Sequence, residues 1–279
     1  MSANNTPLTV TILGSGTCVP SLKRSSCAVL MEMGPTKLLF DSGPGTMRRL
    51  LEAETTIFDI AYVFYSHLHP DHTGELVPLL FSTKYPDENL RRTPLTVVAG
   101  RGFSDFFLGL KRVYGPWIEL GEGLLQIVEL DNQTEDSRQF KNFTVKSAPV
   151  EHSPESIAYR VVAPGGQSAV YSGDTDYSEN LIGLAKDADL LICESALPDK
   201  YRVKGHLTPS LAGQIANRAG VGQLVLTHFY PQCDKEDIEK ECRATYAGPL
   251  ALAEDLMRIE VGHRSRIIKH EIKNSDEKR

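Results

Sequence analysis

Three of the eight histidines lie in the short segment SHLHPDH at residues 66–72. His67 and His69 are two positions apart at the end of a strand-like run, so their side chains should point the same way. The proline that follows turns the chain, which lets Asp71 and His72 approach from another side. Imidazole and carboxylate are both ligands of Zn²⁺. Four potential ligands are more than one tetrahedral ion with an open position needs, so the segment predicts two metals.

One short loop cannot enclose two ions, so the remaining ligands should come from the ends of other strands. Three residues fit, because each directly follows an apolar run: His152, Asp174 and His228. Glu194 ends a further run of this kind. Each of these residues alone could equally be a surface or hydrogen-bonded side chain, and the metal interpretation depends on the cluster at 66–72. His263 and His270 are interpreted as ordinary surface residues of the charged C-terminal region.

The elements that would position these residues alternate between strand-like and helix-like runs. Expected strands are 8–13, 27–33, 37–41, 60–66, 95–99, 124–130, 143–150, 157–162, 168–172, 189–193 and 223–227. Expected helices are 45–53, 73–81, 103–113, 180–188, 209–218 and 235–243. This order favours an α/β fold in which helices cover sheets. We expect one domain over residues 1–263 and a charged tail over 264–279.

Composition and charge restrict the class of protein. Hydrophobic residues make up 41 % and charged residues 24 %, which is typical of a globular domain. No apolar run has the length of a membrane span and the start does not resemble a secretory signal, so we expect a cytoplasmic protein without a membrane partner. The five cysteines are expected to be free thiols. The net charge of −6 argues against a nucleic-acid footprint spread over a whole face.

The motif His-x-His-x-Asp-His, followed by His, Asp and His after later strands, resembles the metallo-β-lactamase superfamily. The closest likeness is to its ribonuclease Z and phosphodiesterase branch: LGSG at 13–16, RSS at 24–26 and LLFDSGPGT at 38–46 look like motifs of that branch. The resemblance covers residues 8 to about 261. It implies an αββα four-layer fold, in which two mixed β-sheets are sandwiched between helices, and it suggests a homodimer.

The resemblance also implies a ligand set for two divalent metal ions. One ion would be bound by His67, His69 and His152. The other would be bound by Asp71, His72 and His228. Asp174 would bridge both, with a water or hydroxide as the second bridge. Zinc fits these ligands, although Mn²⁺ or Fe²⁺ would accept the same set.

Glu194 and His206 resemble the Glu and His that shuttle a proton near the phosphate in this branch. Thr208 and Pro209 are typical of a helix start, so His206 would lie just before a helix N-terminus, where anions are favoured. An adjacent Glu194 would help to keep His206 protonated. The alternative is a strand Glu and an exposed His without a catalytic role.

These residues predict a phosphodiesterase that uses a metal-bridging hydroxide on a small, cyclic or RNA phosphodiester. The expected catalytic residues are Asp71, Glu194 and His206, with His206 protonating the leaving oxygen. Three alternatives stay open: a transfer-RNA 3′-processing endoribonuclease without the inserted arm, a thioester or lactone hydrolase on the same scaffold, and a protein in which the metals serve only folding.

Two departures from the ribonuclease Z pattern concern the substrate. Enzymes that mature transfer RNA carry a basic arm between the third and fourth motifs, whereas only 21 residues separate His152 from Asp174 here. The family loop Pro-x-Lys-x-Arg-Asn is also altered: Pro20 and Arg24 keep their spacing, but Lys23 is displaced and Ser replaces Asn. The aromatic stretch 102–117 could be core packing, an interface or a substrate wall.

Overall fold

The computed structural model describes residues 6–84, 90–262 and 265–268, and their strands form two mixed sheets. In sheet order, the first sheet contains β15 (Arg266–Ile268), β14 (Met257–Val261), β1 (Leu8–Gly14), β2 (Ala28–Met33), β3 (Thr36–Phe40), β4 (Ile60–Tyr65), β5 (Leu95–Gly100) and β6 (Leu125–Leu130). The second contains β13 (Leu250–Leu252), β12 (Leu224–Thr227), β11 (Leu190–Glu194), β10 (Ser168–Tyr171), β9 (Ile157–Val162), β8 (Thr144–Pro149) and β7 (Asp136–Gln139).

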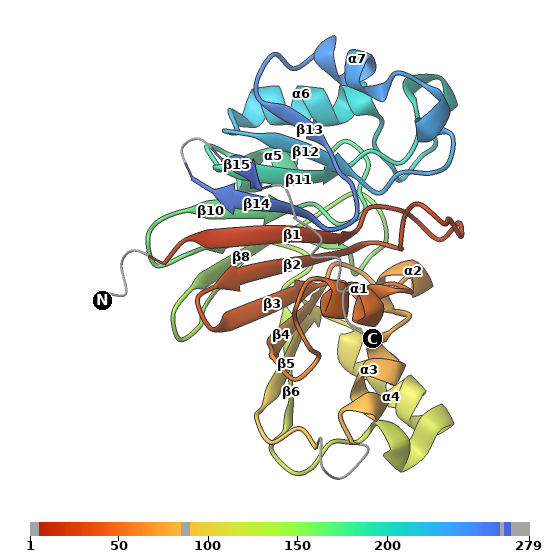
Figure 1. The fold of residues 1–279 in the computed structure, drawn as a ribbon, viewed down its shortest axis with the longest axis vertical. Coiled ribbons are helices and arrows are strands. Elements are labelled where there is room, and N and C mark those ends of the chain that lie inside the picture. Colours follow the sequence, from red (N-terminus) through yellow and green to blue (C-terminus); the bar gives the residue numbers. More distant parts are fainter. Residues whose placement is uncertain (1–5, 85–89, 263–264, 269–279) are drawn as a thin grey trace, which may run out of the picture.

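Helices cover the outer faces of both sheets (Figure 1). Beside the first sheet lie α1 (Thr46–Glu52), α2 (Pro70–Thr73), α3 (Leu76–Ser82) and α4 (Phe103–Tyr114). Over the second lie α5 (Glu179–Ala185), α6 (Pro209–Ala219) and α7 (Ile238–Arg243). Three 3₁₀ turns complete the described elements: η3 (Gly115–Ile118), η4 (Asp199–Tyr201) and η5 (Cys233–Lys235). The αββα four-layer arrangement expected from the sequence is confirmed.

The first sheet lies between two apolar cores. Successive side chains along its strands contribute alternately to one core and to the other. Along β2, Val29 and Met31 join the core shared with the second sheet, while Ala28 and Leu30 face the core beneath α1, α3 and α4. Successive residues of a strand point to opposite faces, so a sheet covered on both sides needs apolar residues at every position. This explains the continuous apolar runs of the sequence.

Both sheets combine antiparallel and parallel pairs in the same way. In the first, β1, β2 and β3 pair antiparallel, and β3 to β6 pair parallel. In the second, β7 to β10 pair antiparallel, and β10 to β13 pair parallel. Parallel neighbours end at the same edge of a sheet, so residues after β3, β4, β10, β11 and β12 can meet.

Some expected elements differ from the structure. The helix expected over 73–81 is divided into α2 and α3, because the Glu75 backbone N–H donates to Ser42 O and its carboxylate accepts from the N–H groups of Gly45 and Met47. Strands β7, β13, β14 and β15 were not expected. In the segment 264–279, interpreted as a tail, residues 266–268 form β15; residues 264 and 269–279 lie outside the described residues.

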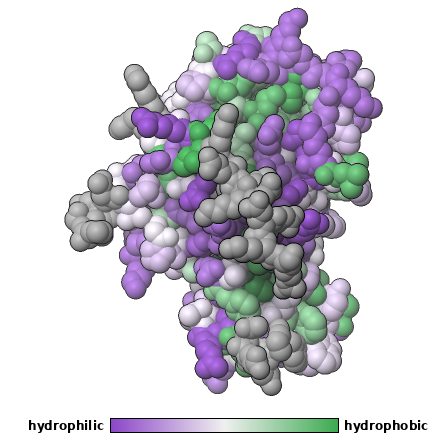
Figure 2. Space-filling view, viewed as in Figure 1, coloured by the Kyte–Doolittle hydropathy of each residue, from purple (hydrophilic) through white to green (hydrophobic). Residues whose placement is uncertain are grey.

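The surface toward the viewer in Figure 2 is polar over much of its area, and apolar side chains gather over α3 and α4 at its lower end. In the described part of the chain, no helix is long and apolar enough to span a bilayer. The aromatic stretch 102–117 has two parts. Phe103 and Phe107 are buried in the core beneath α4, whereas Tyr114 and Trp117 are 43 % and 55 % exposed.

Candidate metal centre

Seven side chains predicted as ligands converge at the edge where the strands end. His67 and His69 follow β4, and Asp71 and His72 lie in the short helix α2 that begins at Pro70. From the second sheet, the site receives residues that follow β8, β10 and β12, namely His152, Asp174 and His228. The two sheets thus each supply one wall of the site.

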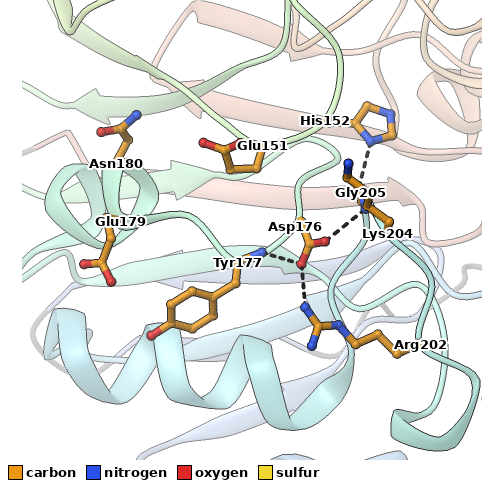
Figure 3. Close-up of a pocket in the computed structure, with 9 residues that line it drawn as sticks. All are labelled: Glu151, His152, Asp176, Tyr177, Glu179, Asn180, Arg202, Lys204 and Gly205. Atoms are coloured by element: carbon orange, nitrogen blue, oxygen red, sulfur yellow. Dashed lines mark hydrogen bonds and ion pairs between the residues drawn. The ribbon is translucent and has the colours of Figure 1, made fainter.

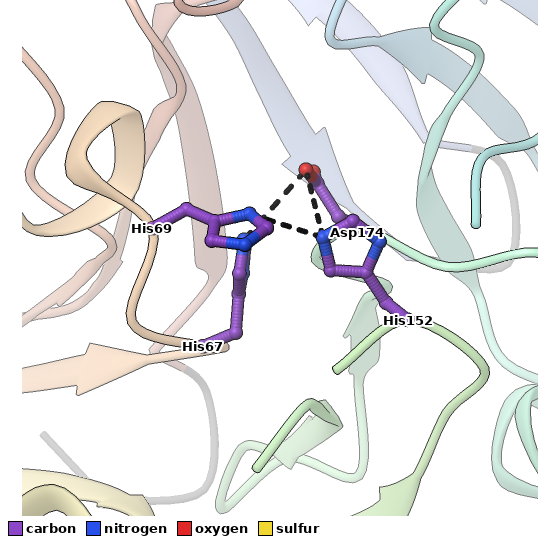
Figure 4. A group of neighbouring side chains, drawn as sticks. All are labelled: His67, His69, His152 and Asp174. Carbon is purple, nitrogen blue, oxygen red and sulfur yellow. Dashed lines mark hydrogen bonds and ion pairs between the residues drawn. The ribbon is translucent and has the colours of Figure 1, made fainter. Parts of the chain in front are cut away.

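One group of potential ligands contains His67, His69, His152 and Asp174, whose ligand atoms all lie within 4.8 Å of one another. Their side chains point toward a common centre (Figure 4). The Oδ2 atom of Asp174 lies 3.7 Å from His67 Nε2 and 3.8 Å from His152 Nε2. His69 Nδ1 lies 3.2 Å from His152 Nε2. Three imidazoles and one carboxylate are a suitable donor set for a zinc-like cation.

A second group lies on the other side of Asp174 and contains Asp71, His72 and His228. The Oδ1 atom of Asp174 lies 3.2 Å from His72 Nε2 and 3.3 Å from His228 Nε2. Asp71 Oδ2 lies 3.7 Å from His228 Nε2. Asp174 therefore presents one carboxylate oxygen to each group, which is the geometry of a bridging ligand.

Several buried polar atoms at this centre have no hydrogen-bond partner: His67 Nε2, His72 Nε2, His228 Nε2 and Asp174 Oδ1. Buried polar atoms are normally paired, because burial without a partner costs about 1–3 kcal/mol each. Four unpartnered atoms that face one centre therefore fit the requirement of bound cations. This donor set indicates divalent metal binding.

The protons on the histidines leave the correct nitrogens free for a metal. His72 Nδ1 lies 2.7 Å from Asp41 Oδ2 and donates to it, so Nε2 is the ring nitrogen that faces Asp174 and could bind a metal. His152 Nδ1 donates to the carbonyl of Gly205 at 2.7 Å, with the same consequence. Hydrogen bonds of this kind orient ligating imidazoles and fix their tautomers.

Asp41 holds the buried side of the site and had no role assigned from the sequence. Its carboxylate accepts hydrogen bonds from the backbone N–H and the hydroxyl of Ser66, from His72 Nδ1, and from the hydroxyl of Tyr171 at 2.6 Å. Ser66 Oγ in turn lies 3.0 Å from His67 Nδ1. One carboxylate thus orients a ligand in each group. Its position directly after β3 is the same signal that identified Asp174.

Three residues that border the site have left-handed backbone. Asp41 and His228 have φ values of 55° and 61°, in a region that residues other than Gly, Asn and Asp rarely adopt. Gly173, just before Asp174, has φ 57°, and a Cβ there would lie 2.4 Å from Ser66 Cβ. Glycine is therefore required where the two sheets approach most closely.

Burial and neighbouring charges shift the ionisation of the cluster. Burial lowers the pKa of His67, and the positive charge of His72 lowers it further. Burial alone would raise the pKa of Asp174, but His228 and His72 overcome this and hold it well below its ordinary value. A carboxylate that stays ionised among imidazoles suits metal binding.

Glu194 and His206 meet at the rim of the site. His206 Nδ1 lies 3.0 Å from Glu194 Oε1 and 3.9 Å from Asp174 Oδ2. Burial would lower the pKa of His206, but the hydrogen bond and charge of Glu194 outweigh it and raise the pKa to about 9. The expected helix start is confirmed, since α6 begins at Pro209 with Thr208 at its N-cap. The Glu194 carboxylate therefore favours the protonated form of His206 beside the cluster.

The positively charged side chains of the altered loop between β1 and β2 contact other residues of the protein. Arg24 donates to Ser15 Oγ and to the carbonyl of Ala253, and its guanidinium also contacts Asp234. Lys23 Nζ lies 2.9 Å from the same Asp234 carboxylate. Both cations of the loop are thus engaged in contacts that fix the loop.

A cavity of about 850 Å³ adjoins the metal centre next to His152 (Figure 3). Its lining is polar: Glu151, His152, Asp176, Tyr177, Glu179, Asn180, Arg202, Lys204 and Gly205. The volume is within the range of small-molecule sites. Apart from His152, the sequence analysis identified none of these residues, because their roles depend on contacts across the second sheet. His263 and His270, interpreted as surface residues, lie outside the described residues.

Comparison with known proteins gives the same fold and family. A ribonuclease Z from Methanosarcina mazei is 27 % identical and aligns over 92 % of this chain and 99 % of its own. The crystal structure of the human tRNase Z short form is 26 % identical, with a TM-score of 0.73 over 91 % of this chain and 99 % of that chain.

The metallo-β-lactamase fold protein YhfI from Bacillus subtilis is 23 % identical, with a TM-score of 0.79 over 92 % of this chain and 100 % of that chain. The sequence profile of the Beta-lactamase superfamily domain matches residues 36–229. The resemblance expected from the sequence is thereby confirmed, and the chain belongs to the β-lactamase superfamily.

Proposed function

We propose that this protein is a metal-dependent phosphodiester hydrolase with two divalent cations, most suitably Zn²⁺. The observation that carries the proposal is Asp174, whose two oxygens face two separate groups of potential ligand atoms. A single structural ion would not require both groups. Similarity to proteins named ribonuclease Z supports phosphodiesters as the substrate class.

The proposed ligands are those that the resemblance implies. His67, His69 and His152 would hold one cation, with Asp174 as the bridging ligand. Asp71, His72 and His228 would hold the other. When bound, a pair of divalent cations supplies an acidified water and neutralises the charge of a phosphodiester.

The chain's own residues would then position the substrate and move a proton. His206 is protonated and half-buried at the rim, so it can donate a proton to a leaving alkoxide. Glu194 accepts the N–H groups of Thr175 and Leu207 as well as His206, which fixes the carboxylate that orients the imidazole. Asp71, whose Oδ2 atom lies 3.7 Å from His228 Nε2, completes the proposed catalytic set.

Four observations favour a small or cyclic phosphodiester over a folded RNA. The cations Lys23 and Arg24 are already engaged by Asp234. Strands β9 and β10, which lie between His152 and Asp174, are joined by residues 163–167 alone, so this connection contains no inserted basic arm. The net charge is −6, whereas RNA binding needs local positive charge. The polar cavity beside His152 has the size for a small substrate.

The test combines metal analysis with hydrolysis of bis(p-nitrophenyl) phosphate and a thioester on the same purified sample. We expect about two metals per chain and turnover of the phosphodiester. Two metals with turnover of the thioester alone would identify the protein as a thioester hydrolase instead. One metal or none would contradict the bridged arrangement of Asp174.

Transfer-RNA 3′-end processing is the second candidate, and the 26 % identity to the human tRNase Z short form over 91 % of this chain favours it. The two candidates are separated by comparing kcat/KM for a precursor transfer RNA with a 3′ trailer against a cyclic nucleotide. Preference for the precursor would identify a processing nuclease without an arm.

We also propose a cytoplasmic homodimer, in line with the family resemblance. The exposed side chains of Phe81, Leu108, Val113 and Trp117 form the apolar surface over α3 and α4. Light scattering should give twice the 30.8 kDa of one chain, and Val113→Glu should shift the mass toward one chain. An unchanged dimer in this variant would exclude this face, and cell fractionation would test the compartment.

A further inference from the structure

The segment that carries His206 is fixed at Gly205 from two sides. The Gly205 N–H donates to Asp176 Oδ2 at 3.1 Å, and its carbonyl accepts from His152 Nδ1 at 2.7 Å. Figure 3 shows both contacts, with Asp176 and His152 on either side of the glycine backbone. One residue beside His206 is thus bound to a predicted metal ligand and to a carboxylate with no assigned role.

Gly205 has little freedom to move away from these partners. Its φ of 90° is left-handed backbone that favours glycine, and a Cβ there would lie 3.4 Å from His152 Nδ1. On the other side of His206, Leu207 N–H donates to Glu194 Oε2. The backbone is therefore held immediately before and immediately after the imidazole.

Asp176 is itself anchored in the loop after β10. Its backbone N–H donates to the carbonyl of Glu151 at 2.7 Å, next to His152. Its Oδ1 atom accepts from the N–H of Tyr177 and lies 3.2 Å from Arg202 Nη2. Asp176 is an acceptor at a defined position two residues after Asp174.

We propose that Asp176 is a positioning residue that sets the location of His206 relative to the metal centre through Gly205. The inference depends on the proposed function, in which His206 protonates the leaving oxygen. Without the Asp176 acceptor, Gly205 keeps only its contact with His152, and the imidazole loses its fixed distance from the reacting phosphate. Proton transfer requires hydrogen-bond distance between donor and acceptor, so the effect falls on that step.

The test uses Asp176→Ala, with Asp176→Asn as the conservative variant and Asp131→Ala as the matched control. Asp131 does not line the cavity, and its carboxylate, like that of Asp176, accepts a backbone N–H and pairs with an arginine, Arg101. Two substrates are compared: a dinucleoside monophosphate, whose alkoxide leaving group needs a proton, and bis(p-nitrophenyl) phosphate, whose leaving group does not.

We expect Asp176→Ala to lower kcat for the dinucleoside monophosphate by about tenfold or more, with kcat for bis(p-nitrophenyl) phosphate within about twofold of wild type. KM and metal content should stay unchanged. Asp176→Asn retains an oxygen acceptor for the Gly205 N–H and should restore most of kcat. Equal losses on both substrates would show a general structural effect and overturn the proposal.

Amide hydrogen exchange gives a readout that does not depend on activity. In Asp176→Ala, the amides of Gly205 and His206 should exchange faster, while residues 60–73 keep their protection. Unchanged exchange at Gly205 would contradict the proposal. If wild type cleaves neither phosphodiester, the proposed function fails, and the exchange result still decides whether Asp176 holds Gly205.

Discussion

Two carboxylate–histidine pairs flank Asp174, and they differ in burial. Asp41 and His72 lie 2.7 Å apart and both side chains are 0 % exposed. Glu194 and His206 lie 3.0 Å apart, with the histidine 16 % exposed. The chemical groups are the same, so the difference in function must come from the surroundings of each imidazole.

In the buried pair, His72 faces Asp41 with one nitrogen and Asp174 with the other, so no nitrogen remains for a substrate. In the rim pair, Glu194 contacts Nδ1 of His206, and the side chain of His206 is partly exposed. We propose that the first arrangement fixes a metal ligand and that the second holds a proton for transfer. On this proposal, access to the imidazole, and not the carboxylate beside it, separates a positioning pair from an acid.

The largest effect is expected for Asp174→Ala, because Asp174 contacts both pairs and both ligand groups. Metal content should fall to one equivalent or less, and phosphodiester turnover should drop by more than about a thousandfold. Elemental analysis and initial rates measure both. Asp131→Ala, which removes a carboxylate that pairs with Arg101 outside the cavity lining, is the control and should retain both. If the variant kept two metals, Asp174 would not be a bridging ligand.

His206→Ala breaks only the rim pair. We expect kcat for an alkoxide leaving group to fall by about 10²- to 10⁴-fold, the usual contribution of a general acid. Metal content and thermal unfolding should stay close to wild type, because the imidazole belongs to the rim. The rates are measured with a dinucleoside monophosphate at saturating metal. Turnover equal to that of wild type would leave His206 without a catalytic role.

Asp41→Asn breaks the buried pair while keeping its backbone, since asparagine tolerates left-handed φ. Because the carboxylate that orients His72 is lost, metal affinity should fall by about 10- to 100-fold. Competition with a chelator measures the change, and excess metal should restore turnover. Persistent inactivity with full metal occupancy would place Asp41 in the reaction instead.

The smallest effect is expected for Tyr171→Phe, which removes one hydrogen bond to Asp41 and one contact with Cys27. Loss of a buried hydrogen bond costs about 1–3 kcal/mol, so the melting temperature should fall by a few degrees. Calorimetry of the metal-free protein measures it. Metal affinity should change less than in Asp41→Asn, and an equal change would mean that Tyr171 orients His72 as strongly as Asp41 does.

The ligand cluster was predictable because its signals are local. His67, His69, Asp71 and His72 are adjacent in sequence, and His152, Asp174 and His228 each follow an apolar strand. The roles of Asp41 and Asp176 were not predictable, because each depends on partners elsewhere in the chain. Asp41 accepts from Tyr171, which is 130 residues away.

The strands, like the site residues, were predictable where they depend on local sequence and not where they depend on distant contacts. Strands rich in β-branched residues were expected nearly within their observed bounds, and Ile157–Val162 agrees at both ends. Strand β7, with the sequence DSRQ, has no apolar alternation and exists through its pairing with β8. Strand β14 pairs with β1 from the opposite end of the chain, as in the contact of Leu8 with Val261. Such pairing leaves no trace in a short window of sequence.

The division of the ligands between two sheets has a consequence for folding. His72 and Asp174 are about a hundred residues apart in sequence but 3.2 Å apart in space, so an ion held by both would act as a removable cross-link between the halves of the chain. Binding at a thousand times its dissociation constant would add about 4 kcal/mol to the stability of the docked sheets. The same ions that serve the reaction would then hold the two halves together. A chelator would therefore lower the stability of the protein as well as its activity.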